Sequence, residues 1–163
     1  MSDAYDKTVS EHLYANRIVY LTGDITTIAG TGAAGDGGDA IQATAALLNA
    51  PGGVALDGTS SLYIADTGNS RVLHVDADTG RIRVVAGTGV AGFNGDGLAG
   101  AFARLDAPDG LAVNGANGNL FIADRAAHRV RRLTVSSGLL DTRAGDGVAG
   151  FAVGVGGEAN AVA

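Results

Sequence analysis

A repeat with a period of 57 residues constrains this chain more than any other feature of its sequence. Residues 29–56 match residues 86–113 without a gap, and 14 of the 28 aligned positions are identical. Self-similarity at such a period is typical of propellers and solenoids, in which each repeat is one supersecondary unit. The fold must therefore place similar units side by side.

The repeat continues beyond this stretch at an offset of 58 residues. Leu62–Asp66 recurs as Leu120–Asp124, and a third copy opens at Ala144. Residues 16–30 resemble the second half of an earlier copy. We therefore expect the following division: an N-terminal segment 1–15 that is frayed, a partial blade 16–30, one repeat over 31–87, a second over 88–145, and the truncated start of a third over 146–163.

Within each repeat, short apolar runs alternate with turn signals. In the first copy the runs cover residues 53–56, 62–65, 71–75 and 82–86, and Gly or Asp stands between them. Glycine provides 27 of 163 residues, which favours turns over helices. The pattern predicts an all-β fold of four-stranded antiparallel units, with one helical turn over residues 43–48. We also expect the continuously apolar strand 53–56 to be covered on both faces.

These motifs together resemble the bacterial NHL repeat. The shared elements are Ala-Gly-Thr-Gly at residues 29–32 and 86–89, Ala-Pro-x-Gly at 50–53 and 107–110, and Leu-[Tyr/Phe]-Ile-Ala-Asp at 62–66 and 120–124. In that family each repeat forms one four-stranded blade of a β-propeller, commonly six-bladed. The resemblance implies an incomplete propeller of about 2.5 blades in this chain. We expect either that the chain is part of a longer product, which we favour, or that copies of it complete the ring as a homo-oligomer.

The turn after the second strand carries the candidate ligand-binding residues. It reads Asp66-Thr67-Gly68-Asn69-Ser70-Arg71 in the first copy, which matches the family pattern, whereas Arg125-Ala126-Ala127-His128 separates Asp124 from Arg129 in the second. We expect this turn and the linker 30–49 to share one face, where loops on a rigid scaffold carry function. The candidates are Asp66, Asn69, Arg71, Asp124, His128 and Arg129. The favoured alternative is structural: each Asp caps backbone N–H groups and pairs with its Arg.

Other polar groups support weaker hypotheses. Oxygen-bearing side chains in the Gly-rich loops could hold Ca²⁺, although the EF-hand spacing is missing. Those residues are Asp36, Asp39, Asn94 and Asp96. A structural role in sharp turns is the favoured interpretation. A cluster of arginines over residues 125–132 would suit an anionic partner or keep a strand edge from pairing. We assign no catalytic residue, cofactor or metal ligand.

Charge and composition limit the function classes. The net charge of −6 disfavours RNA or other nucleic acid as a partner, because that affinity rests on cations. No apolar run reaches the length of a membrane helix, so we expect no membrane partner. The acidic N-terminus shows no signal peptide, although family relatives are often exported, so no compartment is assigned.

The first functional hypothesis is a non-catalytic binding or scaffold module that presents its face loops to a protein or carbohydrate. The alternative is part of a propeller enzyme, a metal-assisted lyase or lactonase. RNA binding is the third hypothesis.

Overall fold

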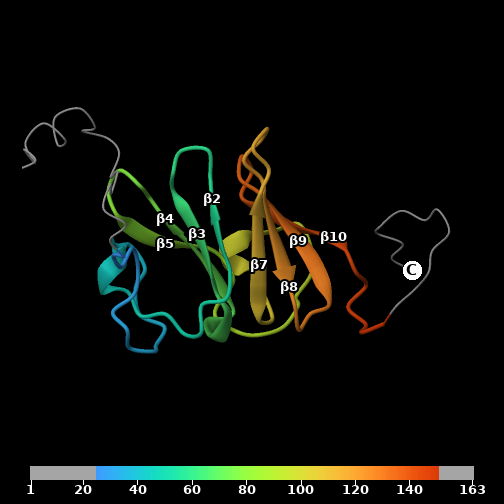
Figure 1. Ribbon diagram of the computed structural model, residues 1–163. Coiled ribbons are helices and arrows are strands. Elements are labelled where there is room, and N and C mark those ends of the chain that lie inside the picture. The colour runs from blue at the N-terminus through green and yellow to red at the C-terminus, as the bar shows by residue number, and fades with distance from the viewer. Residues whose placement is uncertain (1–24, 151–163) are drawn as a thin grey trace, which may run out of the picture.

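The computed structural model describes residues 25–150, which fold into two similar antiparallel sheets. Figure 1 shows the sheets side by side, with β2 of the first next to β7 of the second. The expected segment 1–15 and the larger parts of the partial copies 16–30 and 146–163 lie outside the described residues. Each sheet is one propeller blade, and the described part of the chain is a piece of an incomplete propeller.

The first blade has the strand order β1-β5-β4-β3-β2, and its short 3₁₀-helices are η1 and η2. Its elements are β1 Ile41–Gln42, η1 Ala43–Ala45, β2 Val54–Leu56, β3 Leu62–Asp66, η2 Thr67–Asn69, β4 Arg71–Val75 and β5 Arg81–Ala86. The four expected strands are confirmed as β2 to β5. The expected helical turn is the single 3₁₀ turn η1, and β1 adds a fifth strand of two residues that the sequence did not predict.

The second blade repeats this arrangement in the order β6-β10-β9-β8-β7. Its elements are β6 Leu98–Ala99, η3 Gly100–Phe102, β7 Pro108–Val113, β8 Leu120–Asp124, β9 Arg129–Thr134 and β10 Leu139–Ala144. None of the helices in residues 25–150 has the length and apolar character that a membrane crossing requires.

Asp and Asn side chains form the turns that the composition predicted. Asp57 Oδ1 accepts the backbone N–H groups of Thr59 and Ser61 at 2.8 and 2.9 Å. Asn114 Oδ1 does the same for Ala116 at 2.9 Å in the second blade. These short side chains satisfy backbone donors that a tight turn leaves without a ladder partner.

Two apolar cores stabilise the blades. One lies under the first sheet, where Leu73 and Ile82 pack on Ala43 and Ala46 of the linker. The other fills the seam between the blades, and its members come from both of them. They are Tyr63, Val72, Ala86, Ala103, Leu105, Leu120, Ile122, Leu133 and Leu140. We call the contact between the two blades the seam.

Strand β2 differs from the expectation that it is covered on both faces. The side chains of Val54 and Leu56 are 63% and 66% exposed. β2 is the last strand of its sheet, and among the described residues the second blade lies along β2 and β3 without covering these two side chains. That part of the prediction was wrong because an apolar run shows what a strand can bury, not what lies against it.

Candidate functional site

The first turn, residues 66–71, is held together by the Asp66 carboxylate. Oδ1 accepts the backbone N–H of Asn49 at 2.7 Å, and Oδ2 accepts Asn69 Nδ2 and Arg71 Nε, both at 2.8 Å. Asp66 is fully buried and Arg71 is 8% exposed. The carboxylate therefore caps the linker and pairs with the arginine, as the structural interpretation of this motif predicts.

Asn69 and Arg71 also fasten the linker to the blade. Asn69 Nδ2 donates to the carbonyl oxygen of Gly35 at 2.7 Å, and Arg71 Nη1 donates to that of Asp36 at 2.7 Å. Arg71 Nη2 reaches the carbonyl oxygen of Leu47 at 3.3 Å. The linker and the turn share one end of the sheet, which confirms the expected placement. The polar groups of Asp66, Asn69 and Arg71 are thus engaged within the blade.

The second turn, residues 124–129, keeps only part of this arrangement. Asp124 Oδ1 accepts the backbone N–H of Asp106 at 2.6 Å, which copies the cap at Asn49. Asp124 Oδ2 has no hydrogen-bond partner among the described residues, although the side chain is fully buried. Ala127 stands where Asn69 would supply an amide. The expected Asp124–Arg129 pair is replaced by a longer contact of Oδ2 with Arg131 Nη1, at 3.7 Å.

Arg129 contacts other groups in place of Asp124. Its guanidinium lies over the Phe93 ring, with Cζ 3.9 Å from the ring centroid. Nη1 donates to the carbonyl oxygen of Ala127 at 3.0 Å, and Nη2 donates to that of Asp146 at 2.7 Å. Phe93 occupies the repeat position of Asp36, so the aromatic ring provides a cation–π contact that the first blade lacks.

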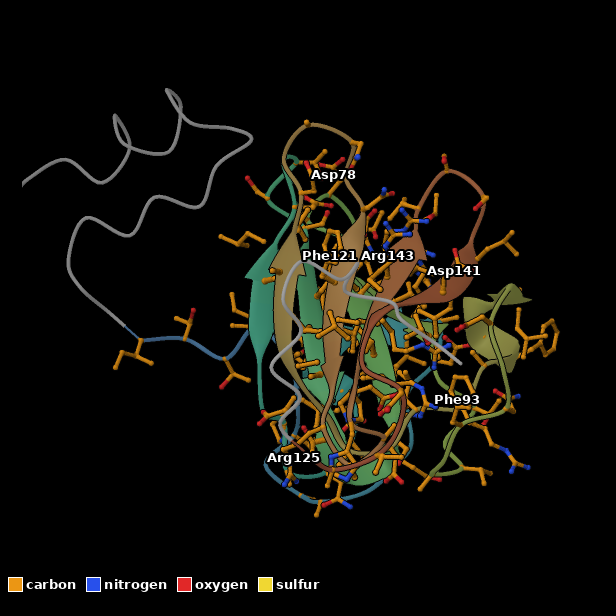
Figure 2. All side chains as sticks on the ribbon, turned by 90° about the vertical axis from the view of Figure 1, so that its right-hand side faces the viewer. Asp78, Phe93, Phe121, Arg125, Asp141 and Arg143 are labelled. Carbon is orange, nitrogen blue, oxygen red and sulfur yellow. The ribbon has the colours of Figure 1, made fainter. Side chains whose placement is uncertain are left out.

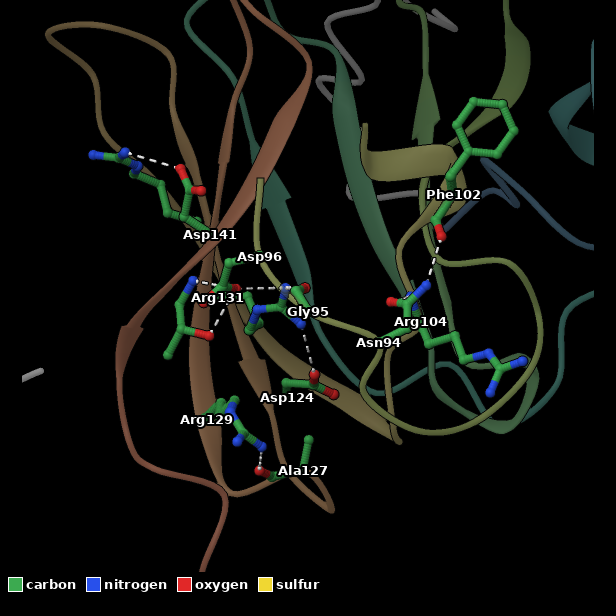
Figure 3. Close-up of polar contacts among 12 residues, drawn as sticks. Asn94, Gly95, Asp96, Phe102, Arg104, Asp124, Ala127, Arg129, Arg131 and Asp141 are labelled. Atoms are coloured by element: carbon green, nitrogen blue, oxygen red, sulfur yellow. Dashed lines mark hydrogen bonds and ion pairs between the residues drawn. The ribbon is translucent and has the colours of Figure 1, made fainter. Parts of the chain in front are cut away.

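Arg131 belongs to the arginine cluster of residues 125–132, but the prediction that this cluster protects a strand edge was wrong for Arg131, because β9 lies inside the sheet between β8 and β10. Arg131 is fully buried at the repeat position of Leu73, and Figure 3 shows its contacts. Nη2 donates to Asp96 Oδ1 and to the carbonyl oxygen of Gly95, both at 3.1 Å. Aligning the two copies would have indicated that Arg131 is buried, because it stands at the repeat position of the apolar Leu73.

The electrostatics of this pair are set by burial. Removal from water raises the pKa of Asp124 to about 6, and the hydrogen bond from Asp106 and the charge of Arg131 only partly offset that rise. Burial likewise lowers the pKa of Arg131. Desolvation therefore outweighs the attraction between the two charges at this distance.

A hollow of about 260 Å³ lies beside the second turn. It is lined by Asp124, Arg125, His128, Arg129, Val130, Ala144 and Gly145. The side chains of Arg125 and His128 are exposed and form no hydrogen bond or ion pair within residues 25–150. Three of the six residues singled out from the sequence, Asp124, His128 and Arg129, thus meet at one surface hollow.

The oxygen-bearing loop residues have structural contacts. Asp39 Oδ1 accepts the backbone N–H of Val84 at 3.0 Å, and Asp96 Oδ1 accepts that of Thr142 at 2.8 Å. Asn94 links the carbonyl oxygen of Phe102 to the backbone N–H of Arg104. Across the described part of the chain, no three His, Cys, Asp or Glu side chains lie close enough together to hold a metal ion.

Comparison with known proteins agrees with this architecture. The family model for the NHL repeat matches residues 105–133. The protein SUPPRESSOR OF QUENCHING 1, chloroplastic, from Arabidopsis thaliana is 36% identical over 92 residues, which cover 56% of this chain and 8% of that protein. The chain thus spans a small part of this relative.

Solved structures are similar in fold. A putative phosphatase from Bacteroides thetaiotaomicron is 20% identical with a TM-score of 0.52, over 70% of this chain and 26% of that one. An auxiliary nutrient binding protein from the same organism is 26% identical with a TM-score of 0.46, over 57% of this chain and 25% of that one. The chain corresponds to about a quarter of each of these proteins.

Proposed function

We propose that this chain, which is built from NHL-repeat propeller blades, is a non-catalytic binding module for a protein or carbohydrate partner. The proposed contact surface is the second turn with its hollow. The observation that carries the proposal is the difference between the two turns. The first uses its polar groups within the blade, whereas the second leaves the exposed side chains of Arg125 and His128 without polar partners among residues 25–150. The buried Asp124 Oδ2 has no hydrogen bond there and only a 3.7 Å contact with Arg131.

The chemistry of the second turn favours a partner with hydrogen-bond acceptors. Arg125 offers a planar fork of donors that suits carboxylates, and His128 adds a further donor. Asp124 Oδ2 is buried, so the proposed recognition rests on the exposed Arg125 and His128. In a chain of net charge −6, this arginine-rich turn is where an acidic peptide or an acidic sugar would meet favourable charge.

The test compares binding to two arrays, one of acidic and neutral peptides and one of neutral and uronate-containing oligosaccharides. We expect the wild-type chain to bind members of one array, and the double variant Arg125→Ala/His128→Ala to bind at least about tenfold more weakly, a loss of about 1.4 kcal/mol. Arg83→Ala is the matched control, because it removes one exposed arginine from β5 of the first blade.

Three results would contradict the proposal. They are an absence of binding to both arrays, equal binding by the double variant, and an equal loss in Arg83→Ala. Circular dichroism of each variant keeps loss of binding separate from loss of folding.

A further inference from the structure

Among residues 25–150, nothing covers one face of the second blade in the way that the second blade covers its counterpart in the first. We call it the open face. Its apolar residues are Phe121, Ala123, Val130 and Ala144, and the ion pair of Arg132 with Asp141 lies on the same side of the sheet. Figure 2 looks toward this side of the molecule and labels Phe121 there. Val130 is 38% exposed, whereas Val72 at the same repeat position is fully buried. The repeat counterparts of the other three, Tyr63, Ala65 and Ala86, are at most 4% exposed.

The second blade itself buries these counterparts. Leu105 and Leu120 share one core with Val72, and Leu111 and Val113 of β7 pack against that core. The seam also has a polar contact at its edge, where the Thr67 hydroxyl donates to the carbonyl oxygen of Pro108 at 2.6 Å. The seam therefore shows what covers a face of this kind: the innermost strand and the linker of a following blade.

The other end of the molecule presents a matching surface. Val54 and Leu56 of β2 stand at the repeat positions of Leu111 and Val113, and they are 63% and 66% exposed. β2 is the repeat counterpart of β7, the strand that covers the first blade. Within residues 25–150, no other blade lies against the side of β2 that carries Val54 and Leu56. The part of the chain that the structure describes thus carries one half of a seam on each side.

We propose that a second copy of this chain docks through the Val54 and Leu56 side of its β2 onto the open face. The contact repeats the seam between molecules and joins two different surfaces, so it is heterologous. Such contacts close into a ring when the rotation between units allows it, and radial repetition of blades favours closure. The association stabilises the chain by removing the exposed side chains of Val54, Leu56 and Val130 from water.

This inference goes beyond the proposed function and competes with it for part of one surface, because Val130 and Ala144 belong to the open face and also line the hollow. At the first turn, which already lies beside a following blade, Thr67 remains half-buried and Gly68 exposed. Arg125 and Ala126 occupy the corresponding positions of the second turn. A docked copy therefore contacts Arg125, as the second blade contacts Thr67, and leaves Ala126 exposed.

The experiment measures mass in solution by light scattering after size exclusion, for the full chain and three variants. Val130→Asp blocks the open face, and Leu56→Asp blocks the β2 side. Val135→Asp is the matched control, because Val135 is 47% exposed and its counterpart Ala77 is exposed although the second blade is present. We expect a discrete oligomer for the wild type and for Val135→Asp, and a single 16.1 kDa chain for each of the other two.

Mixing the two blocked variants gives the sharpest result. Val130→Asp retains an intact β2 side and Leu56→Asp retains an intact open face, so one good seam can form between them. We expect the mixture to give a dimer of one chain of each kind, with unchanged circular dichroism. A wild type that stays a folded monomer at every concentration would overturn the proposal, and so would a mixture that stays monomeric.

Discussion

The two turns occupy the same position in the repeat but make different polar contacts. In the first blade, Asp66 accepts three hydrogen bonds, from Asn49, Asn69 and Arg71. In the second, Asp124 accepts one, from Asp106, and its other oxygen lies 3.7 Å from Arg131. Both turns end in a left-handed residue, since Ser70 and His128 have φ values of 49° and 52°. The blade therefore forms even where the carboxylate of this turn accepts one hydrogen bond instead of three.

The difference arises from a few side chains at equivalent positions. Ala127 replaces the amide of Asn69, Phe93 replaces Asp36, and Arg131 replaces Leu73. Together they move Arg129 onto an aromatic ring and leave Asp124 with a buried arginine at a longer distance. Repeats that share a fold can thus differ in the polar contacts of equivalent turns.

We expect the largest loss of stability when the carboxylate of Asp66 is replaced, and a much smaller one for the same change at Asp124. Asp66→Asn turns an amide toward the donors of Asn69 and Arg71 and leaves a buried guanidinium without its anion, at a cost of about 3 kcal/mol in the free energy of unfolding. Asp124→Asn should cost about 1 kcal/mol or less, because the cap on Asp106 survives and Arg131 keeps Asp96. Urea unfolding of both variants at pH 7 measures the two costs. Equal costs would show that the turns are not different in energy.

A pH series tests the electrostatic side of the comparison. The pKa of Asp124 is raised to about 6, above its ordinary value of 3.8 in the unfolded chain. The folded state therefore holds an extra proton between these values, so stability falls as the pH rises from about 4 to about 6. Because solvent near the hollow screens the carboxylate, we expect the free energy of unfolding to fall by only about 1 to 2 kcal/mol over this pH range. The Asp124→Asn variant should lack this fall, and identical pH profiles for wild type and variant would contradict it.

The smallest effects come from exchanging the residue that distinguishes the two turns. Asn69→Ala removes hydrogen bonds to Asp66 and to the carbonyl oxygen of Gly35, and should cost about 1 to 2 kcal/mol. Ala127→Asn places an amide beside Asp124 Oδ2, and should stabilise by about 0.5 to 1 kcal/mol while it lowers the pKa of Asp124. Thermal unfolding and an NMR titration of the carboxyl group measure both changes. Destabilisation by Ala127→Asn would show that the second turn has no room for the first turn's network.

Much of the fold was predictable because its signals are local and repeated. The 57-residue period, the apolar runs and the Asp- and Gly-rich turns predicted four strands in each blade, and the observed registers join those runs in order. The two-residue strands β1 and β6 were not predicted. They depend on the linker folding back onto β5 and β10, and no periodicity marks that contact.

The sequence by itself determined the blade architecture and the end of the sheet at which the polar turns lie. Only the tertiary structure decided which charges pair. Whether an arginine next to a turn meets its own Asp depends on residues that are distant in the chain, as Phe93 and Asp146 are from Arg129. It also decided which apolar faces are covered, as the exposed Val54 and Leu56 show. Strand formation follows from neighbours in sequence, whereas burial and ion pairing follow from neighbours in space.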